Sequence, residues 1–349
     1  MKIRKILILL CAVVTIAPSL KAQSEAGNDA FAVLNLYNSA QMTARGLNFM
    51  PGFTHDASSA LTNPSSLNAS LNNMASVTYT NLFAGAFQGA LAFTHTFNTL
   101  GNFGFGLQYI NYGSFQLTEP NGDVTGKFSV NDFMFSVSWG MQIEKNLYFG
   151  ATFKPLFSAY ESYSSFAIGF DLAATYVTND KQWQFSGILK NIGRQVSSFG
   201  SVRDTLPFDI MIGASKRLAH APLIIYIVAD KLTKWDIRQT DALDGKQSVG
   251  IDGKIKDDNK FSAFLDKGFR HLHFAVDIVP NDVFYLSLGY SWRQRQEMKV
   301  DDAFSLAGIS YGIGIKYRNY TLNYARNEYH NYGAPNYITL GYTINSTGK

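Results

Sequence analysis

Three polar side chains in the second half of the sequence are spaced so that together they could hold a metal ion. His271, His273 and Asp277 are separated by even numbers of residues, so on a β-strand all three project from one face. Imidazole nitrogens and a carboxylate oxygen are ligands that zinc takes in many proteins. The opposite face of the same strand would be apolar: Leu272, Phe274, Val276 and Ile278. A strand with one apolar face carries polar residues on the other whether or not a metal binds, so we predict a structural role for the trio and no metal site.

Catalytic signatures are weak. Serine, histidine and aspartate are all present, but we find no nucleophile elbow, the strand-to-helix turn that presents a reactive serine in lipases. Gly312 and Gly314 lack the third glycine and the following helix of a nucleotide-binding fingerprint. Cys11 is the only cysteine, and it lies in the leader described below. We therefore predict neither lipase nor protease activity, no catalytic residues and no bound cofactor.

The segment 231–268 is the other place where reactive or binding side chains gather. It contains eight Lys or Arg residues and seven Asp residues, with large apolar residues among them. A long charged loop is often simply mobile and solvated, which is one interpretation. The other is a docking surface, because Trp and Arg are enriched where partners bind tightly. Under the second interpretation we predict partner contacts at four residues: Trp235, Arg238, Phe261 and Phe264.

The elements that must position these residues are β-strands. From about residue 74, apolar side chains recur at every second position, as in Phe103, Phe105, Leu107 and Tyr109. Successive strand residues point to opposite faces, so each segment has one apolar face and one small or polar face. A transmembrane β-barrel requires this division, with lipid outside and a polar lumen inside.

Fourteen such segments can be counted between turn signals. We predict strands at 74–81, 86–97, 102–116, 128–143, 147–156, 164–177, 182–192, 207–217, 223–230, 269–279, 283–292, 304–317, 320–326 and 336–345. An even number suits bacterial outer-membrane barrels, whose two termini lie on the periplasmic side. Short links alternate with longer ones, and we expect the longer ones to face outward: 117–127, 157–163, 193–206, 231–268, 293–303 and 327–335.

The first residues indicate export. Residues 1–22 combine a basic start, an apolar run of eleven residues and a plausible cleavage region, which is typical of a secretory signal peptide. They also carry four basic residues and no acid, so the formal net charge of +4 falls to zero in the remainder. A neutral chain does not suggest a nucleic-acid partner. No later apolar stretch reaches 18 residues, which excludes a helical membrane protein and leaves a soluble β-sandwich or a membrane barrel.

The segment before the first strand carries a resemblance to known families. Residues 38–46 and 56–67, the latter containing Asn63-Pro64, resemble the amino-terminal region of FadL-like outer-membrane barrels. Together with 189–193 and 206–210, they more closely resemble the PorQ family of the type IX secretion system in Bacteroidetes, with PorV and PorP as relatives. The resemblance implies residues 23–73 as a plug-like segment at or in the periplasmic mouth. Residues 74–349 would form a fourteen-stranded barrel in the cell outer membrane.

The resemblance also implies a function. A PorQ-like barrel would be a non-catalytic part of the attachment complex, anchoring a PorZ-like surface protein beside the sortase PorU and the barrel PorV. That complex joins secreted cargo to anionic lipopolysaccharide. The alternative is a FadL-like channel for hydrophobic small molecules, because a shared fold does not fix the function. Predicted inward faces of Ser, Thr, Gly, Ala and Gln suit a wet or plugged lumen better than a lipid pocket.

Overall fold

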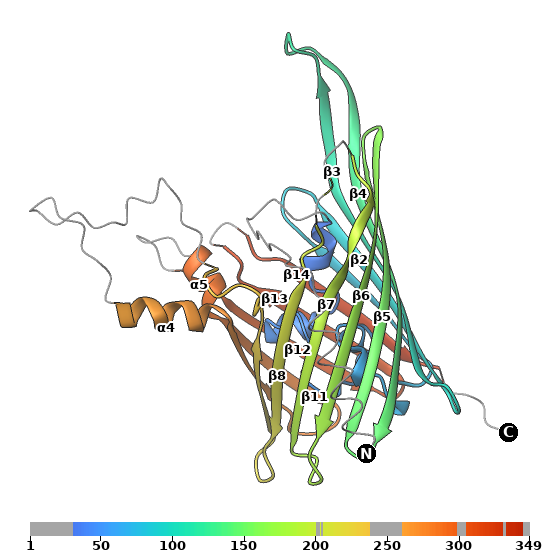
Figure 1. Cartoon of the computed structure of the whole chain (residues 1–349), viewed down its shortest axis with the longest axis vertical. Coiled ribbons are helices and arrows are strands. Elements are labelled where there is room, and N and C mark those ends of the chain that lie inside the picture. The colour runs from blue at the N-terminus through green and yellow to red at the C-terminus, as the bar shows by residue number, and fades with distance from the viewer. Residues whose placement is uncertain are drawn as a thin grey trace, which may run out of the picture.

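The alternating segments form fourteen antiparallel strands, each paired with the strands next to it in sequence (Figure 1). The computed structural model describes residues 31–199, 203, 205–237, 260–298, 305–330 and 333–344. The strands are β1 (Met74–Asn81), β2 (Phe87–Phe97), β3 (Gly101–Thr118), β4 (Val124–Glu144), β5 (Leu147–Tyr160), β6 (Tyr163–Val177), β7 (Trp183–Ser197), β8 (Asp209–Arg217), β9 (Leu223–Ala229), β10 (Leu272–Ile278), β11 (Phe284–Ser291), β12 (Ile309–Tyr317), β13 (Tyr320–Asn327) and β14 (Asn336–Thr343). All fourteen predicted strands are therefore confirmed.

The barrel closes because the last strand pairs with the first. β14 runs antiparallel to β1 in continuous register, from Met74 opposite Thr343 to Asn81 opposite Asn336. Closure gives each strand a hydrogen-bonding neighbour on both sides, which a lipid environment demands because it offers no water to the backbone. The large apolar residues of β14 lie exposed on the outside of the barrel: Ile338, Leu340 and Tyr342.

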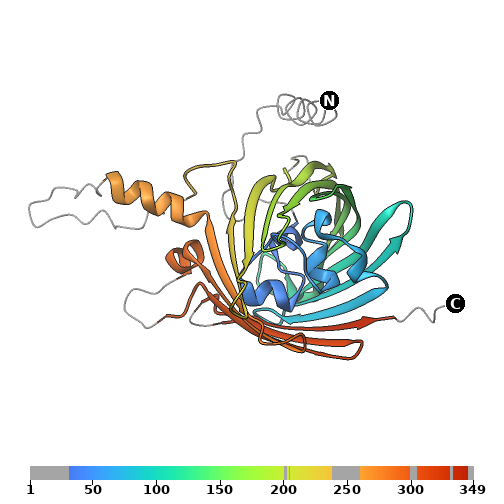
Figure 2. The same cartoon turned by 90° about the horizontal axis from the view of Figure 1, so that it is seen from below.

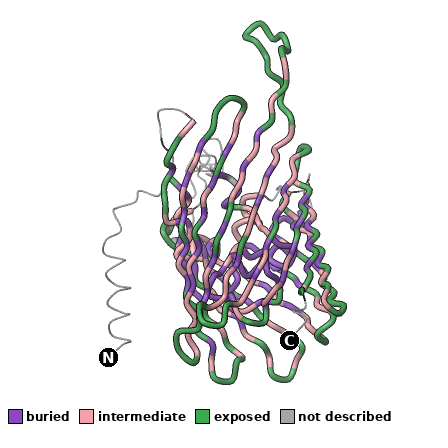
Figure 3. Tube along the Cα trace, turned by 90° about the vertical axis from the view of Figure 1, so that its right-hand side faces the viewer, coloured by how far each residue is buried: buried purple, intermediate pink, exposed green. Residues whose placement is uncertain are grey.

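The two faces of the wall differ as the alternation predicts. Large apolar side chains lie exposed on the outside of the barrel, among them Leu91, Phe105, Phe135, Ile212, Leu288 and Leu322. The inward residues between them are small or polar and are buried: Thr78, Gln88, Ser138, Thr152, Ser186, Ser287 and Thr339. Figure 3 shows this alternation of burial along the strands. Such a surface belongs in lipid, and the chain has the architecture of an outer-membrane barrel.

Several strands on one side are longer than the sequence predicts. β3 and β4 leave only residues 119–123 between them, and β5 and β6 leave only 161–162, where longer outer loops are expected. The physical reason is that the turn-forming residues there sit at the tips of extended hairpins and do not end the pairing below them. This side of the barrel therefore stands taller, as β3 and β4 show in Figure 1.

Two outer connections contain helices that the sequence analysis missed. α4 (Lys260–Arg270) directly precedes β10, so the predicted strand start at residue 269 is wrong. α5 (Trp292–Met298) follows β11 where a loop is expected. In both places a short helix directly adjoins a strand. The predicted strands 269–279 and 283–292 run one or two residues into these helices, because the sequence does not show where the strand ends. α4 projects sideways from the barrel wall (Figures 1 and 2).

Residues 31–73 enter the barrel, and we call them the plug. They form η1 (Ala32–Asn35), α2 (Ala40–Arg45), α3 (Ala57–Ala60), η2 (Pro64–Ser66) and η3 (Ala69–Leu71). Seen along the barrel from below, these short helices lie inside the ring of strands (Figure 2). In the part of the chain that the structure describes, no helix is long and apolar enough to cross a membrane. The predicted signal peptide lies outside the described residues.

The topology predicts which turns face the medium. A single cysteine at Asn121, in the exposed turn between β3 and β4, should react with a membrane-impermeant maleimide on intact cells. Cysteines at Asp282 and Asn319, in the short turns after β10 and β12, should react only after the outer membrane is permeabilised. Mature protein without added cysteine is the control. Labelling in the reverse pattern would show that the barrel is inverted.

Candidate functional site: a plugged lumen

The plug is held in shape by polar side chains that cap its short helices. Ser39 caps α2 by accepting the Gln41 amide, and Asp56 caps α3 by accepting two amides. The Ser39 hydroxyl also donates to the Asp56 carboxylate, which joins the two caps. Capping satisfies amide groups that would otherwise be buried without a partner. Five short helical turns can therefore pack inside the barrel, where Met42, Leu47 and Leu67 of the plug are also buried in apolar clusters.

The Asn-Pro pair that carried the family resemblance fixes the plug to one wall. Asn63 caps η2 by accepting the Ser65 amide, and its side-chain amide donates to the Met50 carbonyl at 2.7 Å. The Ser65 hydroxyl lies 2.7 Å from that of Thr175 in β6. The backbones of η2 and β5 also lie in close contact. A Cβ added to Gly150 in β5 would lie only 2.3 Å from the Pro64 carbonyl carbon, so no larger residue fits there. The motif thus seats η2 directly against β5 and β6.

A buried ion pair fixes the plug to a second part of the wall. The Arg45 guanidinium at the end of α2 contacts the Asp277 carboxylate of β10, with Nη2 to Oδ2 at 2.5 Å. The Tyr226 and Ser287 hydroxyls donate to the same carboxylate at 3.0 and 2.6 Å. The Arg45 guanidinium also lies 4.8 Å from the centre of the Tyr226 ring. Both charged side chains are almost fully buried, so their charges depend on each other for stabilisation.

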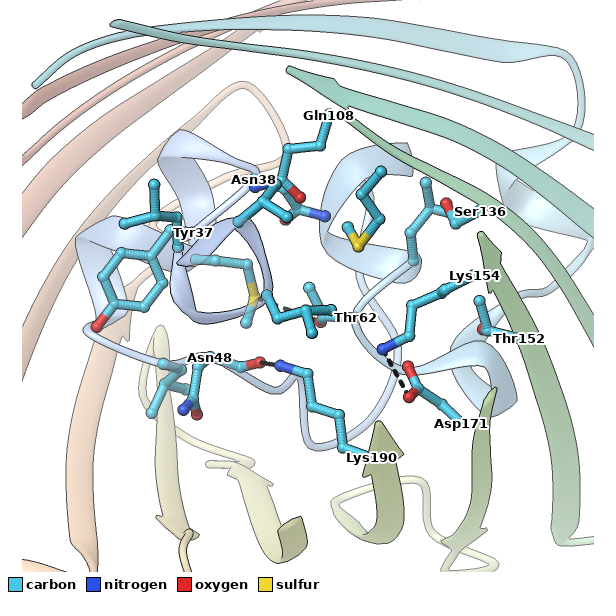
Figure 4. A pocket seen from close by; sticks show the side chains of 17 residues that line it. Tyr37, Asn38, Asn48, Thr62, Gln108, Ser136, Thr152, Lys154, Asp171 and Lys190 are labelled. Atoms are coloured by element: carbon cyan, nitrogen blue, oxygen red, sulfur yellow. Dashed lines mark hydrogen bonds and ion pairs between the residues drawn. The ribbon is translucent and has the colours of Figure 1, made fainter. Parts of the chain in front are cut away.

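A second charged group lies across the lumen. Lys154 of β5 pairs with Asp171 of β6 at 2.7 Å and donates to the Asn191 side-chain oxygen at 2.5 Å. Lys190 of β7 donates to the Asn48 carbonyl of the plug at 3.2 Å. Figure 4 shows both lysines pointing into the space between the plug and the wall. Charged strand residues therefore bind the plug or each other, beside an apolar cluster in which Met42 and Leu47 of the plug are buried.

A third group joins the plug to the outer end of the barrel. Asp230, just after β9, accepts two hydrogen bonds from Arg293 of α5 and one from the side-chain amide of Asn48. His273 Nε2 lies 3.1 Å from the same carboxylate. Burial by itself would raise the pKa of Asp230, but the facing Arg293 and His273 hold this pKa well below its usual value. The carboxylate is therefore a charged anchor for α5 and the plug.

The cavity beside the plug is small. A cavity of about 50 Å³ lies between the plug and the wall. Its lining mixes apolar plug residues with polar strand residues: Leu36, Tyr37, Met42, Gln108, Ser136, Lys154 and Lys190 (Figure 4). A cavity of about 150 Å³ admits benzene, and sites for larger ligands measure about 300–1,000 Å³. This cavity has room for a few waters and none for an aromatic hydrocarbon.

The three residues with metal-ligand spacing face the lumen as predicted, but they have separate partners. The two ring nitrogens of His271 lie 2.8 and 3.2 Å from the carbonyls of Asp230 and Trp235. His273 faces Asp230, and Asp277 is held by Arg45. Among the described residues, no three His, Cys, Asp or Glu side chains are gathered as metal ligands. The trio therefore forms structural contacts in this arrangement.

One sequence motif was overlooked. Residues 308–312 read Gly-Ile-Ser-Tyr-Gly, which has the letters of a nucleophile elbow. Ser310 lies within β12, however, and the chain continues as a strand, so there is no strand-to-helix turn to expose a reactive hydroxyl. Its side chain is buried and its hydroxyl accepts a hydrogen bond from Asn327 at 3.1 Å. The motif is therefore part of the wall.

Three of the four predicted partner-contact residues gather at the outer rim. Trp235 packs on Phe264 of α4, with ring centres 5.4 Å apart, and stacks on His271. Phe261 and Phe264 are more than half exposed, and we call Trp235, Phe261 and Phe264 the α4 cluster. Arg238 lies outside the described residues. The cluster is an exposed apolar surface beside the barrel mouth.

The ion pair that holds the plug in the lumen was not predicted from the sequence. Arg45 lies in the segment 38–46 that carried the resemblance, but its partner Asp277 is 232 residues away. The sequence predicts Asp277 to be an inward residue with a structural role, but it does not indicate which residue it contacts. The available signal was an arginine in a segment otherwise rich in small and amide residues, which needs a buried acid if that segment enters a barrel.

Asn63 offers a matched test of the plug's contact with the wall. Asn63→Ala removes a helix cap and leaves the buried Met50 carbonyl without its donor, so we expect a loss of about 2–3 kcal/mol in the free energy of unfolding. Asn68→Ala removes a similar cap from η3 and a donor to the Ser66 carbonyl, but at a less buried site, and should cost about 1 kcal/mol. Urea unfolding in detergent micelles measures both. Equal losses would contradict the role given to Asn63.

Comparison with known proteins supports the architecture. A scan against models of protein families and a search of curated proteins found no match. Among solved structures, the toluene transporter TodX of Pseudomonas putida has a TM-score of 0.55 at 11% identity, covering 88% of this chain and 98% of TodX. The monoaromatic hydrocarbon channel CymD has a TM-score of 0.52 at 10% identity, covering 91% and 100%. The chain has a FadL-like fold. At such low identity the likeness establishes the fold alone, and it gives no support of its own to the finer PorQ resemblance.

Proposed function

We propose that this FadL-like barrel is a non-catalytic outer-membrane anchor that holds a soluble partner at the cell surface. The observation that carries the proposal is the filled lumen. The plug is bonded to β6 through Ser65 and to β10 through Arg45, and the cavity beside it measures about 50 Å³. A lumen filled in this way is poorly suited to passing a substrate, whereas the outer rim offers exposed apolar surface.

Anchoring needs no chemistry. A closed barrel cannot leave the bilayer without exposing its backbone hydrogen bonds, so a soluble protein bound to its outer rim acquires the same location. The local concentration of that protein near other membrane components then rises without any new contact between them. The fixed plug contributes rigidity, because it ties the outer ends of β9 and β10 to α5 through Asp230.

The finer assignment rests on the sequence resemblance alone. Under this assignment the partner is a PorZ-like surface protein. The barrel would act beside the PorU sortase and PorV, in a type IX attachment complex that joins cargo to anionic lipopolysaccharide. The α4 cluster is the contact surface proposed from the sequence, with Arg238 as a further anchor. Trp and Arg are enriched among the residues that contribute most of the binding energy at protein interfaces.

The anchor proposal is tested on intact cells. Deleting the gene should release at least one surface protein into the medium, and restoring the wild-type gene should return it to the cell. Restoring a gene with Phe261→Ser and Phe264→Ser should not, if the α4 cluster is the contact. A surface proteome unchanged by deletion would refute the anchor function. If cells with the double variant retained the surface protein, the contact would lie elsewhere on the rim.

A channel for hydrophobic small molecules is the second candidate, and the shared fold with TodX and CymD favours it. Conduction would require the plug to move away from the wall, because the cavity beside it is too small for an aromatic ring. Uptake of radiolabelled toluene by cells with and without the gene tests this directly. A difference in initial rate of tenfold or more would replace the anchor proposal with the channel.

A further inference from the structure

The tall side of the barrel exchanges its apolar and polar faces above the membrane. Within the wall of β3 and β4 the outward residues are apolar, as Phe105 and Phe135 are. Higher on the same outer face they become polar: Asn111, Ser114, Gln116, Lys127, Ser129 and Asn131. The height at which this change occurs marks the outer limit of the lipid-facing surface.

On β3 a β-bulge produces the exchange, whereas on β4 the sequence itself changes from apolar to polar at outward positions. β3 and β4 pair in one register as far as Asn111 opposite Asn131, and resume in another with Ser114 opposite Ser129. The extra residue in β3 reverses the direction of each side chain that follows, because strand residues alternate between faces. Gly113 in the bulge has a φ of +94°, which residues with a Cβ rarely adopt.

Beyond the bulge, apolar side chains face the barrel axis. Phe115 lies opposite Phe128, which shares the inward face of β4 with the buried Asp132, and their rings stack 5.6 Å apart. Leu117 lies opposite Gly126 on the same face. Phe115 and Leu117 are 44% and 40% exposed. We call Phe115, Leu117 and Phe128 the ribbon face.

The ribbon face continues an apolar surface that rises from the plug. Tyr112, beside the bulge, packs on the buried cluster that contains Val33 of the plug and Ile110 of β3. Its ring lies 6.5 Å from that of Tyr160. The surface therefore runs from the outer end of the plug up the inside of the tall wall.

Lipid cannot cover the ribbon face. The outward side of the same hairpin is polar at this height, so the bilayer ends below it, and the apolar residues point over the mouth of the barrel. An exposed apolar face in water, rimmed by polar residues, is characteristic of protein interfaces. The expected occupant is therefore a protein seated on the mouth.

The hairpin also offers strand edges. β2 pairs with β3 no further than Asn111, and β5 pairs with β4 no further than Val130. Among the described strands, none pairs with the outer edges of residues 114–118 and 124–129. Two-stranded hairpins are marginally stable in water alone, and unpaired edges readily accept another strand. A partner that adds an edge strand would stabilise the hairpin through backbone hydrogen bonds.

We propose that the ribbon face and the edges beside it form the docking site for a surface protein that presents apolar side chains next to an edge strand. This inference rests on the anchor function proposed above and gives it a second, independent contact surface. The partner would sit over the mouth, with its apolar residues against Phe115, Leu117 and Phe128.

The test uses the full chain in intact cells and the protein that gene deletion releases into the medium. Phe115→Ser with Leu117→Ser should release that protein at least tenfold more than wild type, while the matched pair Ser114→Ala with Gln116→Ala, on the opposite face of the same strand, should retain it. A photoreactive benzoylphenylalanine at Phe115 should crosslink to the same protein, and one at Gln116 should not. Heat-modifiable migration of each variant in gels confirms a folded barrel.

The outcomes separate this inference from the anchor function. Release by gene deletion together with full retention by the double variant Phe115→Ser with Leu117→Ser would overturn the ribbon site and leave the anchor intact. Crosslinks from position 115 to lipopolysaccharide, to a second copy or only to the same chain would also overturn it. No release on gene deletion, with no crosslink at position 115, would overturn both proposals. Specific release and a crosslink to the released protein would support both.

Discussion

Asp277→Ala is expected to lower the free energy of unfolding by about 3–5 kcal/mol, because it leaves the buried Arg45 guanidinium without its counter-charge. The Tyr226 and Ser287 hydroxyls lose their acceptor in the same change. Because Arg45 ends α2, the plug should loosen from β10, and purified protein in planar bilayers should show ion-conducting openings that the wild type lacks. Urea unfolding and conductance recordings measure the two effects.

Two further variants show whether the cost comes from the unpaired charge. Arg45→Met with Asp277→Leu removes both charges and should recover at least half of the loss, since apolar pairs often replace buried ion pairs without penalty. Arg326→Met breaks the more exposed pair with Glu328 and should cost less than about 1 kcal/mol. If the Asp277→Ala barrel were as stable and as closed as the wild type, the Arg45–Asp277 ion pair would not be what holds the plug.

Gly289→Ala is expected to be equally severe although it adds one methyl group. A Cβ at Gly289 of β11 would lie 2.2 Å from the Arg45 carbonyl oxygen, far inside any tolerable contact. Neither group is a flexible side chain, so the end of α2 must move away from the wall. We expect a loss of about 3 kcal/mol or more and increased protease cleavage within the plug.

Gly89→Ala is the matched control, because nothing lies within 4 Å of the added methyl group in β2. It should change the free energy of unfolding by less than about 1 kcal/mol, towards greater stability, since alanine loses less backbone entropy than glycine in a strand. Similar losses for the two variants would mean that close packing of the plug against the wall is not what stabilises the barrel.

The barrel wall was predictable because its physics is local. Period-two alternation and turn residues located fourteen strands, and the even count set the topology. The predicted ends of the strands were wrong where two local patterns overlap. Phe269 belongs to α4, but the sequence predicts it as the first residue of the alternating strand that follows. The bulge at Gly113 was also missed, because one additional residue does not disturb the composition of the strand.

The contents of the lumen were only partly predictable. Inward polarity follows from alternation, and it correctly predicted that His273 and Asp277 face the lumen. The partners of these residues could not be predicted from the alternation. The contacts of Arg45 with Asp277 and of Asn48 with Asp230 depend on how the closed barrel surrounds the plug. Contacts between segments so distant in sequence depend on register and closure, which a single sequence does not specify.

The most direct test of a sealed anchor is to lock the plug in place with a disulfide. A Cβ at Gly46 would lie 3.7 Å from that of Ser310, within the range for a disulfide, so Gly46→Cys with Ser310→Cys should crosslink α2 to β12 on oxidation. Each single variant is the control. We expect oxidised and reduced cells to retain the surface partner equally and to take up toluene at the same low rate. Toluene uptake that is present in reduced cells and lost on oxidation would contradict it, because the plug would then be a moving gate.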